Sequence, residues 1–138
     1  MPDERQQAIG ELVEEWLRHA RSDLAVARMV DDNQIAPEIL AFHAQQAAEK
    51  ALKALLVQRQ IEFPRLHVIG SLLNLCQEAG YEGLESLAEA VTLTRYAVLT
   101  RYPGEEEPVS RQDARQAFEL AEKVLIWVEM QIEELNRE

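Results

Sequence analysis

The sequence is poor in several residue types whose presence would define common protein classes. Its only cysteine is Cys76, which excludes an internal disulfide and a cysteine-rich zinc site. Aromatic residues make up 6%, and five glycines and five prolines are too few for a loop-rich β protein. No apolar run approaches the roughly 18 residues that a membrane-spanning helix needs, and the first residues lack the apolar segment of a signal peptide. We therefore expect a soluble, cytoplasmic protein that does not contact a membrane.

Basic residues are also scarce. The chain has 14 lysines and arginines against 25 aspartates and glutamates, a formal net charge of −11. A surface of this charge repels phosphate backbones, so we do not expect general coating of DNA or RNA. The balance reverses locally, because the segment 43–67 has four basic and two acidic residues, and Arg95 and Arg101 form a second basic spot. A confined phosphate-binding site is therefore compatible with the sequence.

The residues that dominate the sequence are alanine, leucine, glutamate, glutamine and arginine, which are strong helix formers. Hydrophobic residues make up 47%, too many for a disordered chain. Apolar residues recur at helical spacing in five segments, and we predict helices over approximately residues 9–30, 37–58, 67–79, 83–99 and 111–135. Short connections favour antiparallel neighbours. The predicted fold class is therefore all-α, an up-and-down helical bundle in a single domain over residues 1–138.

The last predicted helix has two further features. Ser110 followed by Asp113 is a variant of the capping box that starts helices. Ile126 and Trp127 widen the apolar arc of this helix beyond one stripe. The wider arc indicates either a second buried face, and hence a homodimer, or a helix that lies deeper in its own core.

The second predicted helix has a polar stripe. At about 100° per residue, His43, Gln46, Lys50 and Lys53 fall on one flank, beside alanines that let another helix approach closely. One imidazole, one amide and two ammonium groups in a row suit an anion. The alternative is an ordinary polar flank with pairs four residues apart, such as Glu49–Lys53.

A second candidate region combines Tyr96 with the turn Arg101-Tyr102-Pro103. A planar cation and two aromatic rings suit a phosphate and a nucleobase. The alternative is that Tyr102-Pro103 only ends a helix and packs on the core. His67 can either cap the following helix or donate to a ligand, and Cys76, within an apolar run, is predicted to be a buried thiol.

Several kinds of catalytic site are excluded by the sequence. No glutamate is followed by histidine at the third place, as a di-iron bundle requires. There is neither a GxxxxGK[ST] phosphate loop nor a GxGxxG fingerprint. No basic residue close in sequence activates the Cys76 thiol. We therefore expect no metal, no cofactor and no catalytic residue.

Five stretches, in order along nearly the whole chain, resemble the HEPN family of small helical domains. They are residues 16–24, residues 42–56, His67 with Leu72-Leu73, Arg101-Tyr102-Pro103, and residues 121–128. The most specific is Phe-His-Ala-Gln-Gln-Ala-Ala-Glu-Lys-Ala-Leu-Lys-Ala at 42–54. The resemblance implies a five-helix domain with an antiparallel four-helix-bundle core, usually a homodimer. It also implies pairing with a small nucleotidyltransferase in a toxin–antitoxin-like module, as in many relatives, or binding of nucleotides.

Some relatives are metal-independent ribonucleases in which an arginine precedes a histidine with four to six residues between them. Here Arg59 precedes His67 with seven residues between and Arg65 with one, so this motif is absent. Without it, the acid/base partner for attack by a ribose 2′-OH is missing. We therefore predict a non-catalytic partner of a nucleotidyltransferase. The alternatives are a ribonuclease in which His43 or His67 meets Arg101 across a dimer interface, and a pure interaction module.

In the predicted ligand-binding cleft, the cations hold phosphate, the tyrosines stack on a base and the histidines form hydrogen bonds. The candidate residues are His43, Gln46, Lys50, Lys53, His67, Tyr96, Arg101 and Tyr102.

Overall fold

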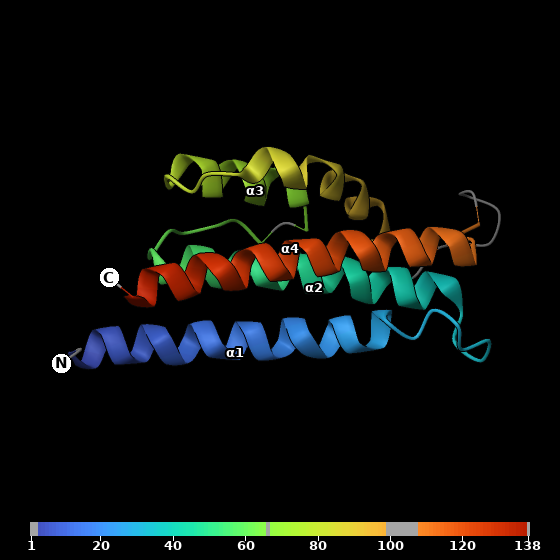
Figure 1. Ribbon diagram of the computed structural model, residues 1–138, viewed down its shortest axis with the longest axis horizontal. Helices are drawn as coiled ribbons and strands as arrows, with labels where there is room; N and C mark the ends of the chain where they lie inside the picture. Colours follow the sequence, from blue (N-terminus) through green and yellow to red (C-terminus); the bar gives the residue numbers. More distant parts are fainter. Residues whose placement is uncertain (1–2, 66, 99–107, 138) are drawn as a thin grey trace.

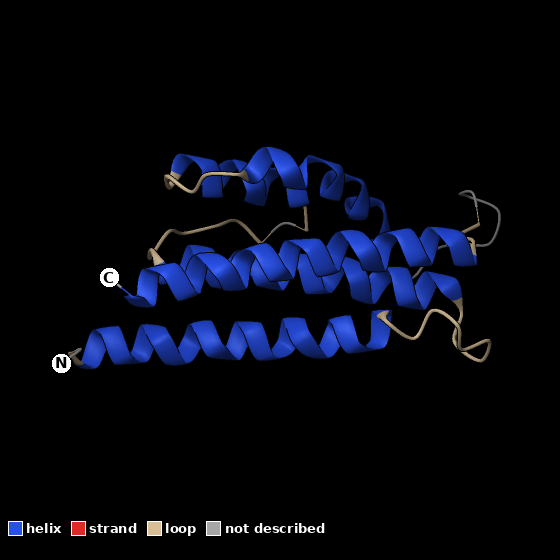
Figure 2. Ribbon diagram, in the orientation of Figure 1, coloured by secondary structure: helices blue, strands red, loops and turns tan. Residues whose placement is uncertain are grey.

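The structure is a computed structural model, in which residues 3–65, 67–98 and 108–137 are described. This described part contains five helical elements and no strand (Figures 1 and 2). They are α1 (Glu4–Ala27), α2 (Pro37–Gln58), α3 (Ile69–Glu78), η1 (Leu84–Tyr96) and α4 (Arg111–Arg137). The predicted all-α class is confirmed.

The helices form an elongated bundle with α2 at its centre (Figure 1). The long helix α1 runs antiparallel to α2 on one side, and the pair α3 and η1 lies on the other. Helix α4 runs antiparallel to η1, so α1, α2, η1 and α4 alternate in direction. Every other element packs against α2. Side chains of α2 are therefore the ones that several elements can reach at once.

The central place of α2 follows from its composition. Its alanines let α1 and α4 approach closely, as the sequence predicted, and its leucines fill the space between the helices. Ten of its apolar side chains have no exposed surface: Leu40, Ala41, Ala44, Ala47, Ala48, Ala51, Ala54, Leu52, Leu55 and Leu56. Burying each leucine stabilises the fold by roughly 1.5–3 kcal/mol. Two charged residues of α2, Glu49 and Lys53, are consequently buried in this packed surrounding.

The observed helix ends refine the predicted ones. Helix α1 begins before the predicted start, because Asp3 caps it and accepts from the Gln6 amide at 2.8 Å. Pro37 occupies the first turn of α2, as predicted. The predicted fourth helix is a 3₁₀ helix, η1, which follows Gly83 in a left-handed conformation. The capping box is confirmed, since Asp113 accepts from the Ser110 amide at 2.9 Å and its own amide donates to Ser110 Oγ at 3.0 Å.

Arg111, at the start of α4, fastens the connection between α1 and α2. Its guanidinium donates to the carbonyl oxygens of Val30, Asp32 and Ile35 at 2.9, 3.2 and 2.9 Å. We expect Arg111→Ala to lower the free energy of unfolding by about 2 kcal/mol, because three carbonyl groups lose a charged donor. Urea unfolding followed by circular dichroism measures this.

The matched control is Arg115→Ala, which breaks only a surface pair between Arg115 and the 86% exposed Asp31. We expect it to change stability by less than about 1 kcal/mol. Equal effects of the two substitutions would contradict the role given to Arg111.

Candidate functional site: the polar face of α2

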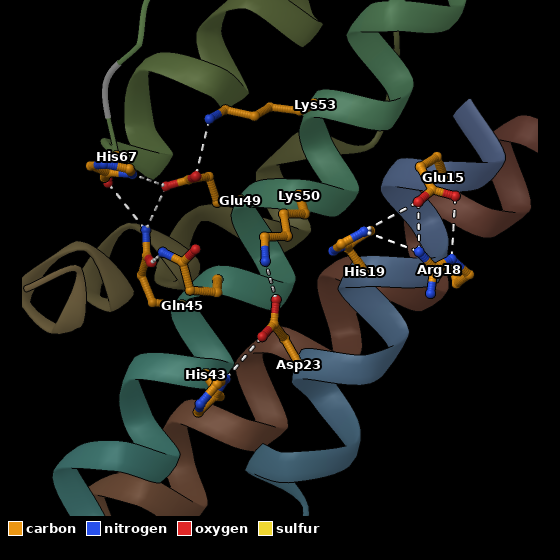
Figure 3. Close-up of polar contacts among 11 residues, drawn as sticks. Glu15, Arg18, His19, Asp23, His43, Gln45, Glu49, Lys50, Lys53 and His67 are labelled. Carbon is orange, nitrogen blue, oxygen red and sulfur yellow. Dashed lines mark hydrogen bonds and ion pairs between the residues drawn. The ribbon is translucent and has the colours of Figure 1, made fainter. Parts of the chain in front are cut away.

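The polar face of α2 is the place where side chains of α1, α2 and the segment after α2 meet (Figure 3). Asp23 of α1 joins two of the predicted residues. One carboxylate oxygen accepts from His43 Nδ1 at 2.9 Å, and the other accepts from Lys50 Nζ at 2.6 Å. The side chains of His43 and Lys50 are 29% and 23% exposed, against 12% for Asp23. A largely buried carboxylate thus holds an imidazole and an ammonium group that solvent can reach.

Glu49 organises a second cluster on the same face. Its carboxylate accepts from His67 Nδ1 at 2.7 Å, from Lys53 Nζ at 3.0 Å and from Gln45 Nε2 at 3.1 Å. Its side chain is only 4% exposed. Burial by itself would raise the pKa of Glu49, but the hydrogen bonds from Lys53, Gln45 and His67 outweigh it and hold the pKa below its ordinary value. Glu49 is therefore a buried anion at neutral pH.

Lys53 lies under aromatic side chains as well as beside Glu49. Its ammonium nitrogen is 5.7 Å from the centre of the Trp16 ring and 5.5 Å from that of Phe63. The two rings contact each other edge to face, at 6.2 Å between centres. This arrangement stabilises a cation through the faces of the rings. The two rings also cover Lys53. Its side chain is therefore buried beneath the polar face and is not accessible to a ligand in solvent.

The charges on this face are balanced in pairs. Asp23 offsets Lys50, and Glu49 offsets Lys53. An ionised carboxylate only accepts hydrogen bonds, so the imidazole proton of His43 and of His67 sits on Nδ1. Among the described residues, no hydrogen bond reaches Nε2 of either ring. The face therefore presents two imidazoles that largely buried carboxylates hold in place.

The remaining predicted residues lie in different places. The half-buried Gln46 donates to Gln45 Oε1 at 2.7 Å and so belongs to the same face. Tyr96 is buried at the end of η1, where the Arg95 guanidinium lies 4.8 Å from the centre of its ring. It lines a hollow of about 270 Å³ between η1 and α4. Arg101 and Tyr102, with the turn that contains them, lie outside the described residues.

Two larger hollows are lined, among the described residues, by side chains other than the predicted ones. One of about 990 Å³ lies between α3 and η1, and another of about 760 Å³ lies where α1 meets the ends of α2 and α4. The Cys76 thiol is buried, as predicted, and burial raises its pKa to about 12. It is therefore an inert thiol at neutral pH.

Sequence reasoning found the cations and imidazoles of this face but missed most of their partners. The pair Glu49–Lys53 is the alternative that the sequence left open, and its four-residue spacing is the signal that reveals it. Asp23 and Phe63 carry no such signal, because their contacts with α2 come from the packing of distant segments. The polar stripe that the sequence predicted to bind an anion has both of its lysines paired with carboxylates, Lys50 with Asp23 and Lys53 with Glu49.

Within the described part of the chain, no helix is long and apolar enough to cross a membrane. The sequence matches the model of the HEPN domain over residues 13–131. It is 31% identical over 124 residues to a protein of Methanocaldococcus jannaschii named as a "putative toxin", and the match covers 80% of this chain and 81% of that protein. The chain belongs to the HEPN family, which confirms the resemblance.

Two crystal structures are similar to the fold described above. An archaeal HEPN homologue is 32% identical, with a TM-score of 0.69 over 87% of this chain and 97% of that one. A protein from Thermus thermophilus is 33% identical, with a TM-score of 0.70 over 86% of this chain and 96% of that one.

Proposed function

We propose that this HEPN protein is the dimeric partner of a small nucleotidyltransferase in a toxin–antitoxin-like module, and that the polar face of α2 binds a nucleotide or polyphosphate. The name of the Methanocaldococcus relative supports the kind of module. The pairing with a nucleotidyltransferase rests on the family resemblance.

The observation that carries the ligand-binding part is the Asp23 cluster. His43 and Lys50 are held by one carboxylate on the same side of α2, and both remain partly exposed. Fixing these donors in advance reduces the entropy lost when a phosphate binds. The residues proposed to contact the ligand are His43, Gln46, Lys50 and His67. Lys53 and Glu49 instead stabilise the structure of the face.

Calorimetric titration with ATP, GTP and their diphosphates tests the binding site. We expect Lys50→Ala to weaken binding about tenfold or more, because a charged hydrogen bond is lost and Asp23 is left facing the phosphate. Arg115→Ala is the matched control, since it removes a cation that pairs with Asp31 and does not belong to the Asp23 cluster. The absence of binding at millimolar nucleotide would contradict the ligand-binding part of the proposal. The pairing with a nucleotidyltransferase would then be tested separately by co-purification.

A second candidate function is cleavage of RNA without a metal. The observation that favours it is that Asp23 and Glu49 orient two imidazoles with Nε2 directed away from the carboxylate. An imidazole held in this way can take the proton of a ribose 2′-OH as the oxygen attacks phosphorus. A cyclic 2′,3′-phosphate forms as the bond between phosphorus and the 5′ oxygen breaks, and the leaving 5′ oxygen takes a proton from the imidazolium or from water.

Incubation of the purified protein with RNA in EDTA separates the two candidates. Cleavage that is lost in both His43→Ala and Asp23→Asn would support the enzyme. Intact RNA together with nucleotide binding would support the non-catalytic function.

A further inference from the structure

The outward side of α4 has an unpaired stripe with the spacing of a coiled coil. Six residues follow one another at intervals of four, three, four, three and four positions, and all six are exposed: Glu119, Lys123, Ile126, Met130, Glu133 and Arg137. The side chains at the centre of this α4 stripe, Ile126 and Met130, are each 54% exposed. An average repeat of 3.5 residues keeps one side of a helix facing a partner helix, and in this stripe the two central positions are apolar and the four outer ones are charged.

The charges of the α4 stripe are arranged symmetrically about its centre. Moving outward from the midpoint between Ile126 and Met130, the next residues are Lys123 on one side and Glu133 on the other. Beyond them come Glu119 and Arg137. Each position is thus matched, at equal distance from the centre, by a residue of the same apolar kind or of opposite charge.

The α4 stripe has no partner within the described part of the chain. The four charged side chains of the stripe form no ion pair there. Their neighbours do: Arg21 of α1 binds Glu129 at 3.0 Å and Arg28 binds Glu122 at 3.3 Å. These two pairs tie one flank of α4 to the end of α1 and to Arg21, and the stripe beside them stays exposed.

We propose that the α4 stripe binds the α4 stripe of a second copy of this chain, with the two helices antiparallel across a two-fold axis. In this arrangement Ile126 packs on Met130 of the other copy, and Lys123 and Glu119 face its Glu133 and Arg137. Each contact occurs twice, because a two-fold interface uses the same patch on both copies. A hollow of about 340 Å³ between α1 and α4, lined by Ile126 and Met130, borders this interface.

The charges select this arrangement over a parallel one. Parallel pairing in register places Lys123 against Lys123 and Glu133 against Glu133, and like charges directly opposed are destabilising. Antiparallel pairing converts the same residues into opposite charges. The inference rests on the dimer in the proposed function and supplies its interface.

Sedimentation velocity of the full chain over a wide range of concentration, in about 0.15 M salt, tests the interface. We expect a dimer. Glu133→Lys places a lysine against Lys123 of the other copy at two symmetric positions and weakens the dimer about tenfold. Adding Lys123→Glu restores opposite charges, so the double variant returns to near the wild-type dissociation constant. Loss of helix propensity cannot explain such a rescue.

Two further variants separate the possible failures. Ile126→Glu with Met130→Glu is expected to give a monomer, whereas Val91→Glu, which alters a 45% exposed residue of η1, leaves the dimer intact. A dimer unaffected by the double α4 change would overturn this interface and keep the dimer itself. A wild-type monomer at every concentration would overturn both, and would leave the stripe to a partner of another kind.

Discussion

Replacement of Glu49 by alanine is expected to lower the free energy of unfolding by about 3–5 kcal/mol. Glu49 is almost fully buried and accepts from Lys53, His67 and Gln45. Without it, the Lys53 ammonium remains in a nearly dry place with no opposite charge. Because domains of this size are stable by only about 5–15 kcal/mol, urea unfolding should show a large fall in the midpoint.

The control for Glu49 is Glu15→Ala. Glu15 also pairs with a cation, Arg18, but the two side chains are 54% and 64% exposed. Water and salt screen such a pair, so we expect little change in stability. If the two substitutions had similar effects, the polar face of α2 would not be the buried network described above.

The same residue predicts how stability depends on pH. The folded-state pKa of Glu49 lies below its ordinary value of 4.5, so its ionised form stabilises the fold at pH values above 4.5. That contribution is lost as the pH falls through the lower folded-state pKa. We expect the difference in stability between the wild type and Glu49→Gln to be constant near neutral pH and to shrink below pH 4.5. A difference that grows toward acid would contradict the sign of the shift.

Leu52→Ala is the second change with a large expected effect, a loss of about 3–5 kcal/mol in the free energy of unfolding. Leu52 has no exposed surface and lies at the middle of α2. Its neighbours on the helix, Ala48 and Ala51, have side chains too short to fill the space that Leu52 would leave. The cavity therefore stays open, which places the cost toward the upper part of the usual range for such substitutions.

Leu12→Ala serves as the comparison for Leu52, because Leu12 is 50% exposed on α1. We expect a change below about 1 kcal/mol, since little apolar surface is withdrawn from water at that position. Thermal unfolding of the two variants should differ by many degrees. A small effect of Leu52→Ala would mean that the alanine-rich helix repacks around the gap.

The fold was largely predictable from the sequence, because helices and their ends are determined by residues close together in the chain. The apolar residues recur at helical spacing, and Pro37 and Gly83 mark where two of the helices begin. The wide apolar arc of the last helix did not show which of its residues are buried within the molecule. In the structure, its two members Ile126 and Trp127 have different surroundings. Trp127 packs edge to face on Tyr81 inside the molecule, while Ile126 faces solvent. Periodicity alone does not distinguish these outcomes, since both residues belong to the same wide arc.

The functional face was predictable only in part. His43, Lys50 and Lys53 lie on one flank of α2 as their spacing requires (Figure 3), and Gln46 joins them through its hydrogen bond to Gln45. Which of them solvent reaches is decided by Asp23 and Trp16 from α1 and by Phe63 from the segment after α2. Such long-range contacts leave no trace in local spacing. For this reason Lys53 is buried and Lys50 is partly exposed, although the two residues are of the same type.

Mapping of ATP binding by amide chemical shifts in NMR tests the central claim most directly. If the polar face of α2 is the ligand site, the shifts that change on titration will cluster at residues 42–53, around Asp23 and at His67. They will be lost in Lys50→Ala and kept in Arg115→Ala. Changes confined to the hollow between α3 and η1, or no changes at millimolar nucleotide, would contradict the assignment of function to this face.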